Sequence, residues 1–193
     1  MRILSSLVFS FLVAGSAFAD EALVSAAQDR LKHNVRYTGS YVKLDYPGGD
    51  VPANTGVCTD VIIRSYRAAF GFDFQKAVHE DMKANFSAYP KNWGLKRTDR
   101  NIDHRRVPNL EAYLKRQGAK LPISKKAADY KPGDIVSWRL PGNLPHIGIV
   151  SDRRASDGTP FIVHNVGAGP QEENVLFAYK ISGHFRYIPD RKE

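Results

Sequence analysis

The order of residue patterns along this chain constrains its fold more than any other feature, because helical patterns fill the first half and strand patterns the second. Four segments have patterns typical of helices: 20–34, 57–70, 74–86 and 107–117. Short apolar runs separated by Gly, Pro and Asp follow at 135–138, 146–151, 161–164 and 184–188, with a further candidate strand at 174–180. Helices followed by strands predict an α+β domain with an antiparallel sheet.

Turn-forming residues mark the ends of these elements. Gly71 and Gly118 follow two of the helical segments, and Pro108 falls in the first turn of the last one. Segment 38–56 is rich in turn formers, so it is predicted to be a long loop with a short extended piece at 41–44. A loop of that length within a compact domain is often functional.

The first 19 residues have the pattern of a secretory signal peptide. Arg2 is followed by a short apolar run, and Ala17 and Ala19 form a small-x-small cleavage site. The apolar run is shorter than the roughly 20 residues that a membrane span needs. We therefore expect a signal peptide at 1–19, a single domain at 20–193, and a periplasmic or secreted protein. A lipoprotein anchor is not expected, because no cysteine follows the cleavage site, and no later segment is apolar enough to span a membrane.

Composition excludes several classes of protein. A hydrophobic content of 42%, with 11% aromatic residues, excludes a disordered chain. The net charge of +8 would fall to +7 on loss of Arg2, but the basic residues are scattered, so a nucleic-acid partner is not expected. Attraction to anionic wall polymers or lipid headgroups remains an alternative. The sequence contains no metal-ligand spacing, so neither a metal nor another cofactor is expected, and the oligomeric state is left open.

Cys58 is the single cysteine of the sequence and falls in the first turn of the helix predicted at 57–70. Unpaired backbone N–H groups and the positive end of the helix dipole can lower a thiol pKa at such a position. A buried, inert thiol is the alternative, because free cysteine is among the most buried residue types. Asp60 would oppose formation of a thiolate. Position alone leaves both possibilities open.

A thiol nucleophile needs a base and a group that orients the base. His146 begins a predicted strand and shares one face with Gly148, which would leave space beside the imidazole for a docked helix end. His164 ends the next strand, and hairpin pairing could set it beside His146. Asn165 is the neighbouring candidate, although strand alternation points it to the opposite face.

These residues and their order resemble the NlpC-type cysteine peptidase superfamily and the related CHAP amidases. The shared elements, in chain order, are GVCTD at 56–60, KPGDIV at 131–136, HIGIV at 146–150 and FIVH at 161–164. The whole chain also resembles an exported bacterial family, domain-of-unknown-function family 1287. The segments that carry this second resemblance are 56–60, FSAYP at 86–90, NIDHRR at 101–106, PGNLPH at 141–146 and HNVGAG at 164–169.

The resemblance implies a papain-like core in which a nucleophile helix packs on an antiparallel sheet. It implies Cys58 as nucleophile, His146 as base and His164 as orienting residue, with amide bonds of cell-wall peptides as substrate. The peptidases often carry a tyrosine about a dozen residues before the cysteine, which Tyr46 matches, although Tyr41 competes and a packed loop tyrosine is the alternative. The VCTD sequence differs from the Asp-Cys-Ser-Gly of the peptidases, which puts the substrate in doubt.

Segment 93–106 is basic and is not explained by the predicted core. His104, Arg105 and Arg106 could line a cleft and bind substrate carboxylates, since arginine suits a bidentate grip. A solvated basic loop is the alternative. Three functions follow from the sequence: a thiol hydrolase of peptide amides, a non-catalytic binding module on the same fold, and an acyltransferase or thioesterase with the same residues.

Overall fold

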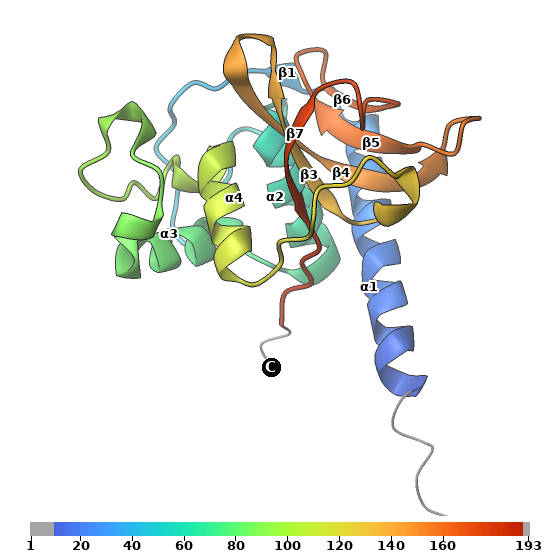
Figure 1. Cartoon of the computed structure of the whole chain (residues 1–193). Helices are drawn as coiled ribbons and strands as arrows, with labels where there is room; N and C mark the ends of the chain where they lie inside the picture. The colour runs from blue at the N-terminus through green and yellow to red at the C-terminus, as the bar shows by residue number, and fades with distance from the viewer. Residues whose placement is uncertain (1–9, 191–193) are drawn as a thin grey trace, which may run out of the picture.

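The computed structural model describes residues 10–190, with side chains from residue 20 onward, and it shows helices packed against one antiparallel sheet (Figure 1). The sheet has five strands in the order β6-β5-β4-β3-β7. A separate pair of very short parallel strands, β1 (Arg36–Tyr37) and β2 (Thr55–Gly56), lies before the second helix. The predicted α+β class is confirmed.

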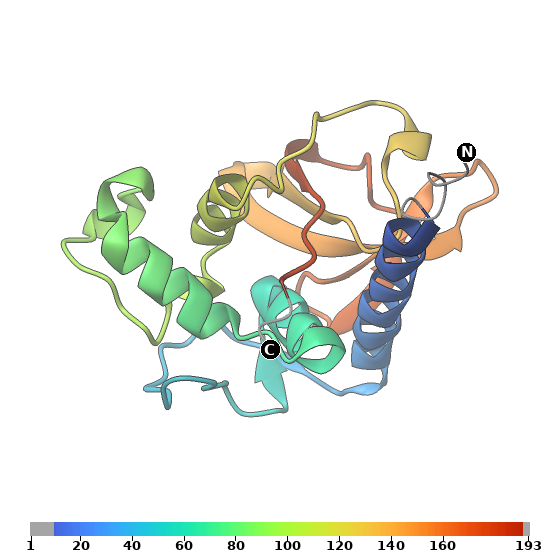
Figure 2. The same ribbon diagram turned by 90° about the horizontal axis from the view of Figure 1, so that it is seen from below.

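Four α-helices of the described chain are α1 (Ser10–Asp29), α2 (Cys58–Phe70), α3 (Phe74–Ala84) and α4 (Val107–Arg116). Figures 1 and 2 both show α2 between α1 and α3. Local signals set their ends as expected. Gly71 ends α2 in the left-handed conformation at φ 64°, and Pro108 lies in the first turn of α4.

The strands of the sheet are β3 (Ile135–Leu140), β4 (Leu144–Arg154), β5 (Pro160–Asn165), β6 (Pro170–Glu173) and β7 (Lys180–Phe185). Three of them lie where the sequence predicts a strand. The strand expected at 184–188 instead covers Lys180–Phe185. It begins earlier because Lys180 already pairs with Arg139 of β3, and the pairing ends where Phe185 meets Ile135. The candidate strand at 174–180 is wrong, since residues 174–179 form turns and the edge strand β6 precedes them. The extended piece expected at 41–44 is not a strand either.

The two faces of the sheet pack into different apolar clusters. On one face, Ile147, Ile149 and Val163 pack with the buried side of α2, including Cys58 and Ile62. The other face is covered by a smaller cluster, whose fully or nearly fully buried members are Tyr130, Val136, Trp138, Val150, Ile162 and Leu176. Because side chains alternate along a strand, each residue of β4 and β5 belongs to one of these two faces.

The first turns of α1 extend away from the rest of the protein, whereas its later turns pack against α2 (Figure 1). The buried side chains of the described part of α1 are Leu23, Val24 and Ala27. Residues 1–9 of the predicted signal peptide lie outside the described residues. Within the described part of the chain, no helix has the length and apolar character that a membrane crossing requires.

Candidate active site

Cys58 is the first residue of α2, and the local sequence explains why the helix begins there. The Asp60 carboxylate accepts a hydrogen bond from the backbone N–H of Val57 at 2.6 Å, which caps the first turn. Gly56 permits this close approach, because a Cβ atom there would lie 3.2 Å from Asp60 Oδ2. The thiol is therefore held at the amino end of a helix, as the sequence predicts.

Cys58 is 5% exposed, and backbone N–H groups act on its thiol. Burial raises its pKa to about 11, even though the N–H of Ile147 and, more weakly, those of Thr59 and Cys58 itself lower it, while the nearby Asp60 charge raises it further. The resting protein thus holds a neutral thiol at neutral pH. Any reaction at this sulfur requires a base that removes the proton.

Tyr37, which sequence reasoning did not select, contacts the thiol. Burial raises the pKa of its hydroxyl to about 12, and the charge of Cys58 and a hydrogen bond to the thiol act in the same direction. The parallel pairing of β1 with β2 places Tyr37 opposite Gly56, two residues before Cys58. Tyr46 lies elsewhere: its hydroxyl donates to Glu80 of α3 at 3.4 Å and its ring packs edge-on against His79. The expected place of Tyr46 near the thiol is therefore corrected in favour of Tyr37.

His146 and His164 lie side by side, as hairpin pairing of β4 and β5 predicts. Nε2 of His146 is 3.0 Å from Nδ1 of His164, and the two rings meet edge to face at 81°. Both are almost fully buried, at 3% and 2% exposure. Burial, followed by the charge of His164, lowers the pKa of His146 to about 4, so its imidazole is neutral at neutral pH.

The amino end of α2 approaches β4 at Ile147, the residue that follows His146. The N–H of Ile147 acts on the Cys58 thiol and lowers its pKa. The Ile147 side chain joins the cluster that contains Cys58. The His146 ring lies on the other face, 5.9 Å from the Trp138 ring.

Gly148 does not leave the space that the sequence suggested for a docked helix end. A Cβ atom at this position would lie 2.5 Å from Cγ2 of Ile162, 3.0 Å from the Val163 oxygen and 3.1 Å from Cβ of His164. Strand β5 fills the space instead. Glycine is needed at position 148 because the two strands that carry the histidines approach so closely there.

Glu173 of β6 also belongs to this cluster and was missed by sequence reasoning. Its Oε2 lies 3.0 Å from Nε2 of His164, an ion contact rather than an aligned hydrogen bond. Burial lowers the pKa of His164, and the Glu173 charge opposes that shift. The PQEE sequence of β6 has neither apolar alternation nor a catalytic motif, so the sequence gives no signal for this contact.

Asn165 is buried on the opposite side of β5 from His164, as strand alternation predicts. Its Oδ1 accepts the N–H of Gly167 at 3.1 Å, while its Nδ2 has no partner among the described residues. It lines a small pocket of about 10 Å³ together with Val57 and Asp60. Asn165 therefore lies near the start of α2 but not against the imidazole pair.

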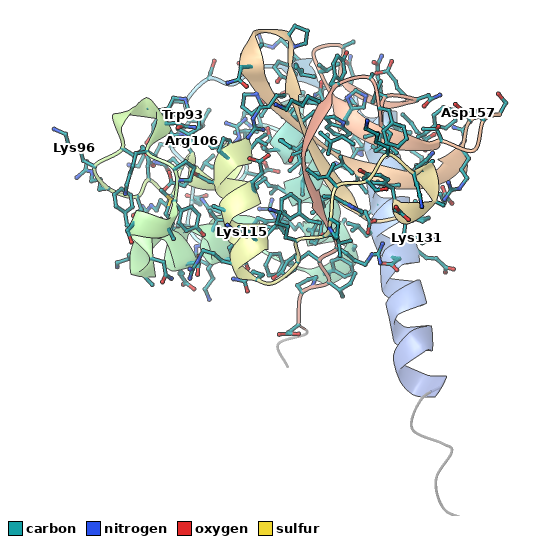
Figure 3. The ribbon with its side chains drawn as sticks, in the orientation of Figure 1. Trp93, Lys96, Arg106, Lys115, Lys131 and Asp157 are labelled. Atoms are coloured by element: carbon teal, nitrogen blue, oxygen red, sulfur yellow. The ribbon has the colours of Figure 1, made fainter. Side chains whose placement is uncertain are left out.

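The basic segment 93–106 differs from both alternatives weighed for it. His104 and Arg105 are buried, so they neither line an open cleft nor form a solvated loop, and this expectation is corrected. The Arg105 guanidinium binds both carboxylate oxygens of Asp60, at 2.9 and 2.8 Å. Arg106 lies 4.5 Å above the ring of exposed Trp93, and Figure 3 shows both at the same end of the molecule as Lys96.

No cluster of three or more His, Cys, Asp or Glu side chains among residues described by the structure has the arrangement of a metal site. The site is instead a buried thiol at a helix start on one face of the sheet and a pair of buried imidazoles on the other face, linked along β4 by the neighbouring residues His146 and Ile147. The class that the fold and these residues define is an α+β domain with a buried thiol at a helix start and a buried imidazole pair.

Within that class, the chain belongs to the family described as "Domain of unknown function (DUF1287)", whose model matches residues 24–187. It is 54% identical over 167 residues to "Uncharacterized protein YijF" of Escherichia coli (strain K12), covering 86% of this chain and 81% of the relative. Among solved structures it is similar to NlpC1 from Trichomonas vaginalis, with a TM-score of 0.44 and 16% identity. That similarity covers 88% of this chain and 44% of the other, so this chain spans less than half the length of NlpC1.

Proposed function

We propose that this protein is a thiol hydrolase that cleaves amide bonds, with peptides of the bacterial cell wall as its substrate class. The observation that supports the proposal is that Ile147, whose N–H lowers the pKa of the Cys58 thiol, directly follows His146 of the buried histidine pair. Burying two imidazoles lowers stability in acid, and titratable groups with shifted pKa values gather at functional sites.

In the proposed reaction, the His146 ring turns from its resting place against Trp138 toward Cys58 and removes the thiol proton, while the sulfur attacks the carbonyl carbon of the amide. The carbon–nitrogen bond then breaks, and His146 returns the proton to the leaving amine. Water attacks the resulting thioester, which releases a carboxylic acid and restores the thiol. His164 orients His146 during both steps, and backbone N–H groups at the start of α2 are candidate donors to the oxyanion.

The burial of Cys58 supports a second candidate, a binding module on the same fold. A thiol that is 5% exposed, with a pKa raised to about 11, is typical of an inert cysteine. Such a module would hold wall peptides without cleaving them, and Cys58→Ser would leave its affinity intact.

Alkylation of Cys58 separates the two candidates without knowledge of the substrate, because this is the single cysteine of the sequence. The rate is measured against pH in the full-length wild type, in His146→Ala and in the matched control His33→Ala, whose histidine is exposed on the surface. A hydrolase should react faster near neutral pH than His146→Ala by about tenfold or more. Superimposable profiles that rise only toward pH 11 would contradict the hydrolase and favour the binding module.

Digestion of purified peptidoglycan fragments then tests the reaction itself. The wild type should release new amino groups, and Cys58→Ser should not. With an added amine acceptor, a hydrolase gives free acid, whereas an acyltransferase gives the new amide.

We also propose that residues 1–19 are removed on export and that the mature protein is periplasmic or secreted. The packing of α1 supports this, because Leu23, Val24 and Ala27 of its later turns are buried, while its first turns extend away from the protein (Figure 1). N-terminal sequencing of protein recovered outside the cytoplasm should begin at Asp20. A chain lacking residues 2–19 should have a melting temperature within about 2 °C of the full chain, because ~0.5 kcal/mol corresponds to that shift.

A further inference from the structure

Among the side chains that the structure describes, Glu173 is the acidic one in direct contact with the buried histidine pair. It stands on the edge strand β6, its side chain is 43% exposed, and its Oε2 lies 3.0 Å from Nε2 of His164. The pairing of Ile162 with Glu173 and of His164 with Gln171 places these side chains on the same face of the sheet. Neither the resemblance nor the proposed triad gives this carboxylate a role.

Glu172, the residue before Glu173 on β6, does not share the contact that Glu173 makes with His164. Glu172 points to the other face, where it accepts hydrogen bonds from Ser151 and Arg153. Both carboxylate oxygens of Glu172 therefore have hydrogen-bond partners, and this side chain faces neither imidazole. Among the described residues, the charged or titratable groups that face His164 are His146 from β4 and Glu173 from β6.

The positions of the protons follow from these contacts. A carboxylate oxygen attracts a ring N–H and repels a ring lone pair, so the nitrogen of His164 that lies 3.0 Å from Glu173 should carry the proton, which makes His164 the Nε2–H tautomer. Its Nδ1 then has a lone pair and accepts the bond from His146 across 3.0 Å. Nε2 of His146 must be the donor, which leaves Nδ1 of His146 without a proton.

We propose that Glu173 is a positioning residue that fixes the tautomers of both histidines and leaves Nδ1 of His146 free as the base. The inference rests on the proposed function for the identity of the base, but not for the tautomers themselves. If His146 takes up the thiol proton, as the proposed function requires, Nδ1 is the nitrogen that receives it. The Glu173 carboxylate acts on His146 through His164.

The tautomers can be measured directly by long-range proton–nitrogen NMR on the full-length protein labelled with ¹⁵N. At neutral pH both histidines should show a protonated Nε2 and an unprotonated Nδ1. In Glu173→Leu, His164 should lose this preference and populate the Nδ1–H form. The pH at which the pair takes up a proton should fall by about one unit, as expected on loss of a neighbouring negative charge.

Two further variants separate the contact from general effects. Glu21→Gln removes one exposed negative charge far along the chain on α1 and should leave both tautomers unchanged. Glu173→Gln retains an acceptor oxygen, so it should keep the tautomers but show the same fall in the protonation pH. Alkylation of Cys58 near neutral pH should slow about tenfold in Glu173→Leu, in line with a one-unit change.

The wild type alone can overturn the proposal, even where a variant fails to fold. A proton on Nδ1 of His164 in the wild type would refute it, as would unchanged tautomers in a folded Glu173→Leu. The proposed function fails separately: if Cys58→Ser retained full hydrolysis, the tautomers could still stand as found, and only the role of His146 as base would be lost.

Discussion

Replacing Gly148 with alanine tests the close approach of the two strands that carry the histidines. The added Cβ would meet Cγ2 of Ile162 at 2.5 Å and the backbone oxygen of Val163 at 3.0 Å. Ile162 is fully buried and β-branched, so it has little rotamer freedom with which to move aside, and a backbone oxygen has less. The strands must separate, which would also lengthen the contact between His146 and His164.

The expected loss of stability follows from two opposing effects. Overpacking a core costs about 1–3 kcal/mol, and the top of that range applies where backbone is the obstacle. Replacing glycine also restricts the unfolded chain, which returns about 0.4–1 kcal/mol. We therefore expect the free energy of unfolding, measured by urea titration, to fall by about 2 kcal/mol.

Gly39→Ala is the matched control, because a Cβ atom there meets only Cγ1 of Val57, at 3.8 Å. It should leave the free energy of unfolding unchanged or raise it by up to about 1 kcal/mol. If Gly148→Ala behaved like Gly39→Ala, the strands would not be as close as described, and the reasoning about position 148 would be refuted.

Two further predictions concern buried charge. Arg105→Ala leaves the Asp60 carboxylate buried without its partner, so stability should fall by about 3–5 kcal/mol in urea titrations. Stability should also decrease as the pH falls from about 6.5 toward 4, because unfolded histidines take up protons that the folded ones refuse. His146, with its pKa lowered to about 4, contributes about 3 kcal/mol over that range, and His104 acts in the same direction. Asp103 opposes them in part, since burial raises its pKa to about 6.

Controls for these two predictions lie in the same protein. Arg116→Ala breaks a more exposed ion pair with Asp81 and should cost about 1 kcal/mol or less. A similar loss in Arg105→Ala would contradict the importance of burial. For the pH dependence, His146→Asn should flatten the decline in acid, and an unchanged slope would show that His146 is not held neutral.

Local sequence signals were sufficient for the helices and for the start of α2. Gly71 and Pro108 act on their own turns, so their effects could be predicted without knowledge of tertiary contacts. The pairing of His146 with His164 was also predictable, because a hairpin brings the ends of consecutive strands together.

Contacts between distant segments could not be predicted in this way. Tyr37 reaches Cys58 only because β1 pairs with β2, and each of these strands is two residues long. Arg105 is buried because its partner lies 45 residues away on α2. Glu173 gave no sequence signal, since its strand is recognised only through its pairing with β5.

The position of β6 at the edge of the sheet has a consequence for how the site responds to its surroundings. Cys58 and both imidazoles are shielded from water, but the side chain of Glu173, whose carboxylate contacts His164, is 43% exposed. Dissolved ions can therefore approach Glu173 and weaken its field, whereas they cannot reach Cys58. The buried histidine pair therefore remains sensitive to ionic strength through Glu173, which lies at the rim of the sheet on β6, two strands from His146 on β4.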